Sequence, residues 1–160
     1  FDPLTLELDD RNINRIKAFA EGGDGDYTYS INGGSETYDS EFQITATDTY
    51  SVTVTDGNGC SITQEIFMEF IDVEIPNFFT PDADGQNDTW APKNIEQYPN
   101  IFIKIFDRYG RNLFQFKGNQ DAWNGEYQLK GLPTGDYWYI IRLNGVEDRR
   151  EFVGHFTLYR

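Results

Sequence analysis

The feature that most limits the possible folds is an alternation of apolar and polar side chains with a period of two. From Tyr50 to Thr55 every even position is apolar and every odd position carries a hydroxyl group. Residues 27–31 alternate in a similar way, and no window of useful length shows the helical spacing of about 3.6 residues. Because successive side chains of a strand point to opposite faces, this pattern predicts half-buried antiparallel strands and an all-β fold.

Turns rich in glycine and asparagine divide the first half of the chain into short strands. Asp56-Gly57-Asn58-Gly59 supplies the positive φ angles that a tight hairpin needs. Strands are expected near residues 4–8, 13–20, 27–31, 41–46, 49–55 and 61–71. This spacing predicts an Ig-like sandwich of about seven short strands. Cys60 follows the turn and is the only cysteine, so no intrachain disulfide can form, and we expect a small buried side chain.

The second half alternates as well, but both faces of its strands carry large apolar groups. Ile103 and Ile105 share one face, while Phe102 and Phe106 share the other. Residues 137–143 are apolar on both faces in the same way. A strand of this kind lies in the centre of a sandwich or offers one face to a partner. The sequence therefore predicts two consecutive Ig-like antiparallel β-sandwich domains.

The charge is shared unevenly along the chain. Residues 1–72 hold 15 acidic and 3 basic side chains, a formal charge of −12, whereas residues 73–160 hold 12 and 10, a charge of −2. This shift predicts one domain over residues 1–72 and a second over residues 73–160. The total of −14 argues against nucleic acid or an anionic membrane surface as a partner, because both attract cationic proteins. No apolar run approaches the roughly 18 residues of a membrane span, so we expect no membrane insertion, and any export signal upstream in a longer polypeptide.

An acidic loop in the second half is a candidate cation site. Its oxygen-bearing side chains belong to Asp82, Asp84, Gln86 and Asp88. Ca²⁺ takes about six to eight oxygen ligands, which such a loop can begin to supply. The EF-hand pattern fails, however, because Gly85 comes too early in the loop and Lys93 stands where that pattern needs a glutamate. A bare corner built from Asx-turns is the alternative, and both interpretations stay open.

Catalytic machinery is not assembled anywhere in the sequence, and we expect no enzyme. His155 is the only histidine and neighbours no second candidate ligand, which indicates a strand residue that hydrogen-bonds locally. Acidic pairs are abundant in a chain of this charge and select no acid–base pair. The aromatic residues are candidates for a sugar-stacking platform, although core filling explains most of them. That candidate set is Trp90, Trp123, Tyr137, Trp138 and Tyr139, of which Trp138 is expected to point outward.

Five ordered segments of the second half carry a family resemblance. They are Ile75–Trp90, Ile103–Arg111, Trp123–Gly125, Leu132–Tyr139 and Gly154–Arg160. Together they resemble the type B C-terminal sorting domain of the Bacteroidota type IX secretion system, also called the gliding motility-associated C-terminal domain. The first half resembles the SprB-repeat or Ig-like modules of large surface proteins. That resemblance is carried by Gly22-Gly23, Tyr27–Ser30, Asn32–Gly34 and Tyr50–Cys60.

The resemblance implies that the second domain is an address for secretion and that the first is a spacer or adhesive stalk. After export to the periplasm, the folded domain would be recognised by the type IX outer-membrane translocon and a PorP/SprF-like outer-membrane protein. The cargo, a SprB-like gliding adhesin, would then reach the cell surface or the extracellular space. The residues that the resemblance assigns to partner binding are Phe78, Phe79, Pro81, Gly85, Asn87, Gly154, His155, Phe156, Thr157, Leu158, Tyr159 and Arg160.

The role of the terminal strand, residues 151–160, is open. Its edge groups and carboxylate are available to a receptor by strand addition or terminal capture, but the strand is equally suited to closing the sandwich.

The competing interpretation of the whole chain is a calcium-dependent adhesive or glycan-binding β-sandwich module of a surface protein. A structural stalk without either activity is the third.

Overall fold

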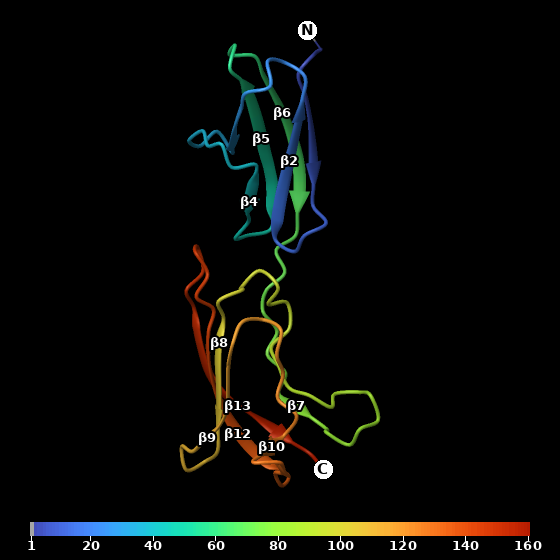
Figure 1. The fold of residues 1–160 in the computed structure, drawn as a ribbon, viewed down its shortest axis with the longest axis vertical. Coiled ribbons are helices and arrows are strands. Elements are labelled where there is room, and N and C mark those ends of the chain that lie inside the picture. Colours follow the sequence, from blue (N-terminus) through green and yellow to red (C-terminus); the bar gives the residue numbers. More distant parts are fainter. Residues whose placement is uncertain (1) are drawn as a thin grey trace. The chain divides into compact units, whose positions relative to one another are not determined.

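The computed structural model describes residues 2–160, and all regular secondary structure in that range is β-strand. The all-β prediction is therefore confirmed. Across the same residues, no helix has the length and apolar character that crossing a membrane requires. The chain divides into two compact units, Phe1–Ile71 and Asp72–Arg160, coloured blue to green and green to red in Figure 1.

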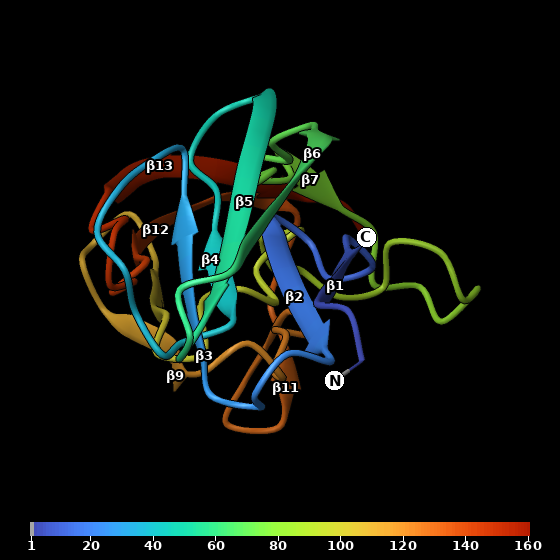
Figure 2. The ribbon, with the colours of Figure 1, turned by 90° about the horizontal axis from the view of Figure 1, so that it is seen from above.

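The first unit is a sandwich of two three-stranded antiparallel sheets, with orders β1-β2-β4 and β3-β5-β6 (Figure 2). Its strands are β1 (Thr5–Asp9), β2 (Arg15–Glu21), β3 (Tyr27–Ile31), β4 (Glu41–Gln43), β5 (Asp48–Asp56) and β6 (Ser61–Met68). The structure thus has six strands in residues 2–71 rather than about seven. Buried residues of both sheets, such as Ile16 and Val52, belong to one core.

Strand β5 shows why this sequence forms a sandwich. Tyr50, Val52 and Val54 are buried, whereas the hydroxyl residues between them are half-buried, as the alternation predicts. The expectation of a buried Cys60 is wrong, because its thiol is exposed. Cys60 lies at the end of a hairpin turn, where its N–H donates a hydrogen bond of 2.8 Å to the carboxylate of Asp56, and not inside a strand.

The second unit is built on one five-stranded sheet with the order β7-β13-β12-β8-β9 (Figure 1). Its strands are β7 (Phe78–Phe79), β8 (Phe102–Phe106), β9 (Asn112–Lys117), β12 (Gly135–Arg142) and β13 (Glu151–Leu158), and a separate small pair is formed by β10 (Glu126–Tyr127) and β11 (Lys130–Gly131). The pairs are antiparallel except for β7 and β13, which run parallel. The strands that the sequence marks as apolar on both faces, β8 and β12, lie in the interior of the sheet.

Irregular segments, more than strands, cover one face of this sheet. Trp90 and Trp123 exchange backbone hydrogen bonds of 2.8 and 2.9 Å, and both indoles are buried. Each indole N–H is satisfied, since that of Trp90 donates to the carbonyl of Pro76 at 2.8 Å and that of Trp123 to the carbonyl of Glu126 at 2.9 Å. A buried indole needs such a partner. The face that these indoles cover is called the inner face below.

A polar cluster ties the start of the second unit to the segment between β12 and β13. The guanidinium of Arg150 lies 2.7 Å from the carboxylate of Asp72 and 2.8 Å from that of Asp148. The Tyr98 hydroxyl donates to Asp148 at 2.8 Å. Hydrogen bonds from Arg150 hold the pKa of Asp148 at about 2, below its usual 3.8, and they lower the pKa of Asp72 as well. Burial, reinforced by the bond to Asp148, raises the pKa of Tyr98 to about 12.

This cluster predicts a loss of stability in acid. Because the folded pKa of Asp148 is depressed, its contribution is fully present above about pH 4 and is lost as the pH falls toward 2. We expect Arg150→Gln to remove that part of the pH dependence, measured by urea unfolding of the second unit between pH 5 and pH 2. Arg149→Gln is the matched control, because the structure of residues 2–160 gives Arg149 no ion pair. Equal slopes for the two variants would contradict the assignment.

Candidate partner-binding surface on the second unit

Successive residues of β13 point to opposite faces of the sheet. The tail residues that the resemblance assigns to partner binding therefore do not share one surface. Phe156 and Leu158 point to the inner face and are fully buried, at 0% exposure. His155 is exposed and Thr157 half-buried, and both point to the opposite side, which we call the outer face. The paired aromatics divide in the same way, since Phe79 is buried and Phe78 is 47% exposed.

The buried tail residues form the centre of the core. The Phe156 ring is stacked on the indole of Trp90 with the ring centroids 4.2 Å apart. It also meets Phe79 and Trp123, each at 5.9 Å, and Tyr139 at 6.4 Å. Phe156 and Phe79 therefore act through the fold and are not free to bind a partner.

The outer face carries apolar side chains on several neighbouring strands, among charged ones: Lys104 lies opposite Ile140, and Arg142 forms an ion pair with Glu151. In register across the sheet, Trp138 lies between Phe106 and His155. Ile140 lies in the next row, beside Val153, which is 66% exposed. None of these side chains packs against the buried core of the unit. The placement of Trp138 agrees with the expectation that it points away from Tyr137 and Tyr139.

Two tail residues that the resemblance assigns to partner binding, Gly154 and Arg160, contribute to the structure of the second unit. A Cβ on Gly154 would stand 2.5 Å from the hydroxyl of Tyr139, so a larger residue there would displace that ring. The guanidinium of Arg160 donates to the carbonyls of Leu132 at 2.8 Å and of Pro81 and Gly125 at 3.3 Å. Arg160 thus fastens the end of the chain to three loops of its own unit. Tyr159, by contrast, is 51% exposed and lies edge-on to Phe78.

The acidic loop brings three of its predicted side chains together. Carboxylate oxygens of Asp82, Asp84 and Asp88 lie within 4.8 Å of one another. The Asp88 carboxylate also accepts hydrogen bonds from the N–H groups of Ala83 at 2.7 Å and Gly85 at 2.8 Å. Asp82 and Asp84 make the Asx-turns of a bare corner, because their carboxylates accept the N–H groups of Asp84 at 3.1 Å and of Gln86 at 2.7 Å. The calcium site therefore stays a prediction, with Gln86 exposed at the rim of the loop.

Asn87 and Gly85 shape this loop through their backbones. Both have positive φ angles, 52° and 87°, and the carbonyl of Asn87 accepts a 2.8 Å hydrogen bond from Thr80. Pro81 is half-buried, and its carbonyl is one of the groups that hold Arg160. These residues position the loop beside the end of β13, and their role in binding a partner stays a prediction.

A sugar-stacking platform made from the full aromatic set does not form. Trp90, Trp123 and Tyr137 are at most 6% exposed, so their rings fill the core. Trp138 alone of this set lies on the outer face.

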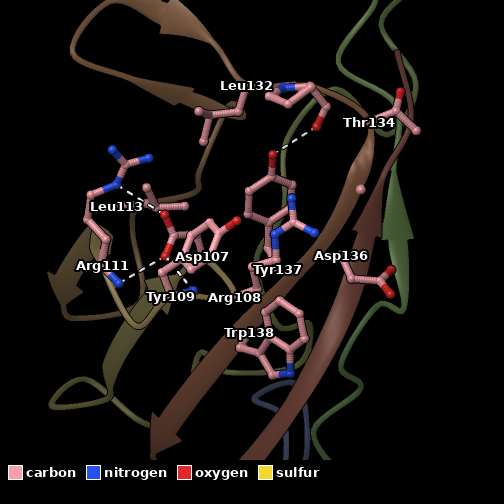
Figure 3. A pocket seen from close by; sticks show the side chains of 12 residues that line it. Asp107, Arg108, Tyr109, Arg111, Leu113, Leu132, Thr134, Asp136, Tyr137 and Trp138 are labelled. Carbon is pink, nitrogen blue, oxygen red and sulfur yellow. Dashed lines mark hydrogen bonds and ion pairs between the residues drawn. The ribbon is translucent and has the colours of Figure 1, made fainter.

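An open pocket of about 380 Å³, which the sequence did not predict, lies between the β8–β9 turn and the start of β12 (Figure 3). Leu132 and Tyr137 line it, and the Tyr137 hydroxyl donates to the carbonyl of Pro133 at 2.8 Å. At the other side, Asp107 accepts the backbone N–H of Arg111 at 2.9 Å. Partial burial raises the pKa of Asp107, but hydrogen bonds led by that of Arg111 outweigh it and lower the pKa. The two sides meet only because β8 pairs with β12, which no local pattern reveals.

The chain is similar to a solved structure and to a protein-family model. Among solved structures, the crystal structure of dimeric latent PorU from Porphyromonas gingivalis matches 98% of this chain with 12% sequence identity and a TM-score of 0.35. The chain spans 20% of the length of that PorU chain. No curated protein matches the sequence. Residues 73–158 match the model of the CHU_C type IX secretion signal domain. That match covers more than half of the sequence, and the chain therefore belongs to the CHU_C type IX secretion signal domain family.

Proposed function

We propose that the second unit is the sorting signal that delivers a large gliding adhesin through the type IX outer-membrane translocon. The family itself is one of secretion signals, whose task is export across the outer membrane to the cell surface or beyond. The adhesin cargo, a SprB-like protein of a gliding member of the Bacteroidota, is the finer part of the proposal. The first unit, with its acidic surface and sandwich fold, serves in this proposal as a spacer or adhesive stalk.

The proposed recognition surface is the outer face of the five-stranded sheet. The outer face presents Trp138, Ile140 and Val153 side by side, and none of them contributes to the core of the unit. Apolar side chains outside the core add little to the stability of a small unit, whereas tryptophan is a frequent anchor of protein interfaces. Exposed Phe78 and Tyr159 extend this surface to the end of the chain.

The proposed receptor is a PorP/SprF-like outer-membrane protein acting with the translocon. A reporter fused ahead of residues 1–160 tests this partner in a host that carries a type IX system. We expect the reporter at the cell surface in the parent strain and in the periplasm of a strain that lacks the PorP/SprF-like gene. Equal surface delivery in the two strains would remove this partner from the proposal.

A second candidate function is calcium-dependent adhesion or glycan binding by the chain itself. The observation that favours it is the convergence of Asp82, Asp84 and Asp88, whose carboxylate oxygens lie within 4.8 Å. Three carboxylates at this distance repel one another unless a cation or backbone N–H groups offset the charge. A glycan array probed with the full chain, with and without Ca²⁺, separates this function from sorting.

The calcium site predicts a stabilisation by added metal. If Ca²⁺ binds only the folded loop, the second unit gains about 2.7 kcal/mol when the free ion is 100 times its dissociation constant. We expect a higher melting temperature in millimolar CaCl₂ for the parent chain and a smaller shift for Asp84→Asn. MgCl₂ at the same ionic strength controls for screening. An unchanged melting temperature in CaCl₂ would eliminate the site.

A further inference from the structure

One long edge of the sheet in the second unit is incompletely paired. Strand β13 pairs with β12 over all eight of its residues, from Glu151 to Leu158. On its other side it pairs with β7 only at Thr157 and Leu158. The N–H groups of Thr157 and Tyr159 donate to the β7 side at 2.9 and 3.0 Å, which shows that odd-numbered residues of β13 point there.

By the same alternation, Glu151, Val153 and His155 direct their N–H and C=O groups to the unpaired part of this edge. Within residues 2–160, none of these groups takes part in a ladder or turn hydrogen bond on that side. Glu151, Val153 and His155 are also exposed to solvent. The edge therefore offers three donors and three acceptors in a regular row.

The chain before β7 cannot fill this gap. Pro76 has no N–H to donate, and its carbonyl accepts the indole N–H of Trp90 at 2.8 Å. Further back, the N–H and C=O of Glu74 both bond to Lys93, at 3.2 and 2.8 Å. This segment is thus held in the layer that covers the inner face, and β7 is limited to two residues.

The unpaired part of β13 also lacks the usual protection of a sheet edge. Natural edges are blocked by proline, lysine, bulges or a covering segment. The opposite edge, β9, has such features: a register shift interrupts its pairing with β8, Lys117 ends the strand, and the nearby Arg111 lies over the Tyr127 ring at 4.8 Å. Strand β13 from Glu151 to His155 pairs with β12 without a shift and carries neither lysine nor proline, and its one acidic side chain, Glu151, forms an ion pair with Arg142 of β12.

We propose that Glu151–His155 is a strand-addition site for an extended segment of the translocon protein that receives this signal. The inference rests on the proposed sorting function and specifies how the partner is held. The added strand makes backbone hydrogen bonds along the edge, and its side chains alternate between the two faces. On the outer face they meet Val153, and on the inner face they lie beside Gly154, where the Tyr139 ring forms the floor. A proline-free segment with an apolar residue at that inner position fits this edge.

Hydrogen exchange on the purified full chain tests whether the edge is open. We expect the amides of Val153 and His155 to exchange at least about 100-fold faster than those of Phe152 and Gly154, which pair with β12. Slow exchange at Val153 and His155 would overturn the inference, because the edge would already be filled.

Export of the reporter fused to residues 1–160 tests the docking itself. Val153→Pro removes an outward N–H and places the ring in the path of an added strand, while the bonds to β12 remain. We expect surface delivery to fall by about tenfold, since an edge hydrogen bond is lost and a partner group is left unsatisfied. The matched control is Val146→Pro, which places a proline at an exposed position outside this edge, and its delivery should match the parent.

The outcomes separate the two proposals. If the parent fusion is exported and Val153→Pro is exported equally well, strand addition is wrong and sorting stands. If the parent fusion stays in the periplasm, sorting fails and strand addition fails with it. Should Val153→Pro be protease-sensitive, benzoylphenylalanine introduced at position 153 decides. A photo-adduct with an outer-membrane translocon protein from position 153, but not from a probe at the exposed Val146, supports the site, and the lack of an adduct from position 153 contradicts it.

Discussion

Replacing Phe156 by alanine is expected to unfold the second unit and to abolish export. The side chain is 0% exposed and stacks on Trp90 at 4.2 Å, with Phe79 and Trp123 at 5.9 Å. Truncating a buried phenylalanine destabilises a protein by about 3–5 kcal/mol. A domain of this size has a total stability of about 5–10 kcal/mol, so the change removes a large share of it. Urea unfolding followed by tryptophan fluorescence measures the loss, because all three tryptophans belong to this unit.

The matched control for this prediction is Tyr159→Ala, a truncation on the same tail at a side chain that is 51% exposed. We expect it to change the free energy of unfolding by no more than about 1 kcal/mol. The contrast also bears on deletion of Gly154–Arg160, which removes two buried side chains and the anchor formed by Arg160. Such a deletion tests folding before it tests recognition. Similar losses for Phe156→Ala and Tyr159→Ala would contradict the division of the tail into inner and outer residues.

The second large effect is expected on the outer face. Changing Trp138 and Ile140 together to threonine keeps residues that favour strands but removes the apolar surface. If these side chains are anchors of the interface, partner binding weakens by at least about 2 kcal/mol, or roughly thirtyfold. We expect surface delivery of the reporter to fall by at least tenfold, roughly in line with that estimate. Stability should change far less than for Phe156→Ala, because neither side chain belongs to the buried core.

Val146→Thr is the control for this pair, since Val146 is an apolar residue that is 84% exposed and lies between β12 and β13. Its delivery should match that of the parent. Fractionation into surface and periplasmic pools, with thermal melts of each purified chain, gives both readouts. Normal delivery of the double variant would show that the translocon does not use the outer face.

Local alternation was sufficient to predict most strands of the first unit. In β5 the apolar side chains point inward and the hydroxyls outward, so the pattern of side chains determines both the strand and its buried face. The two-sided strands β8 and β12 also appear where the sequence places them. Their apolar character on both faces has a structural counterpart, because these strands lie inside the sheet and turn one face to the core and the other away from it.

The irregular segments that cover the inner face of the second unit could not be predicted from local alternation. The bridge between Trp90 and Trp123 joins residues 33 positions apart, and neither neighbourhood alternates. The parallel pairing of β7 with β13 depends on a contact across most of the domain. For the site, the alternation of the tail already separates Phe156 from His155, whereas the family resemblance treats the tail as one element. The open edge of β13 follows only from the bonds that draw Pro76 and Glu74 away.

Two reporter fusions in a host with an active type IX system show whether the second unit is the sorting signal. One reporter precedes residues 1–160 and the other precedes residues 1–71 alone, and protease added to intact cells reports which reporter is outside. We expect surface exposure of the first reporter and periplasmic retention of the second. Retention of both, or surface exposure of both, would contradict the assignment of the sorting signal to the second unit.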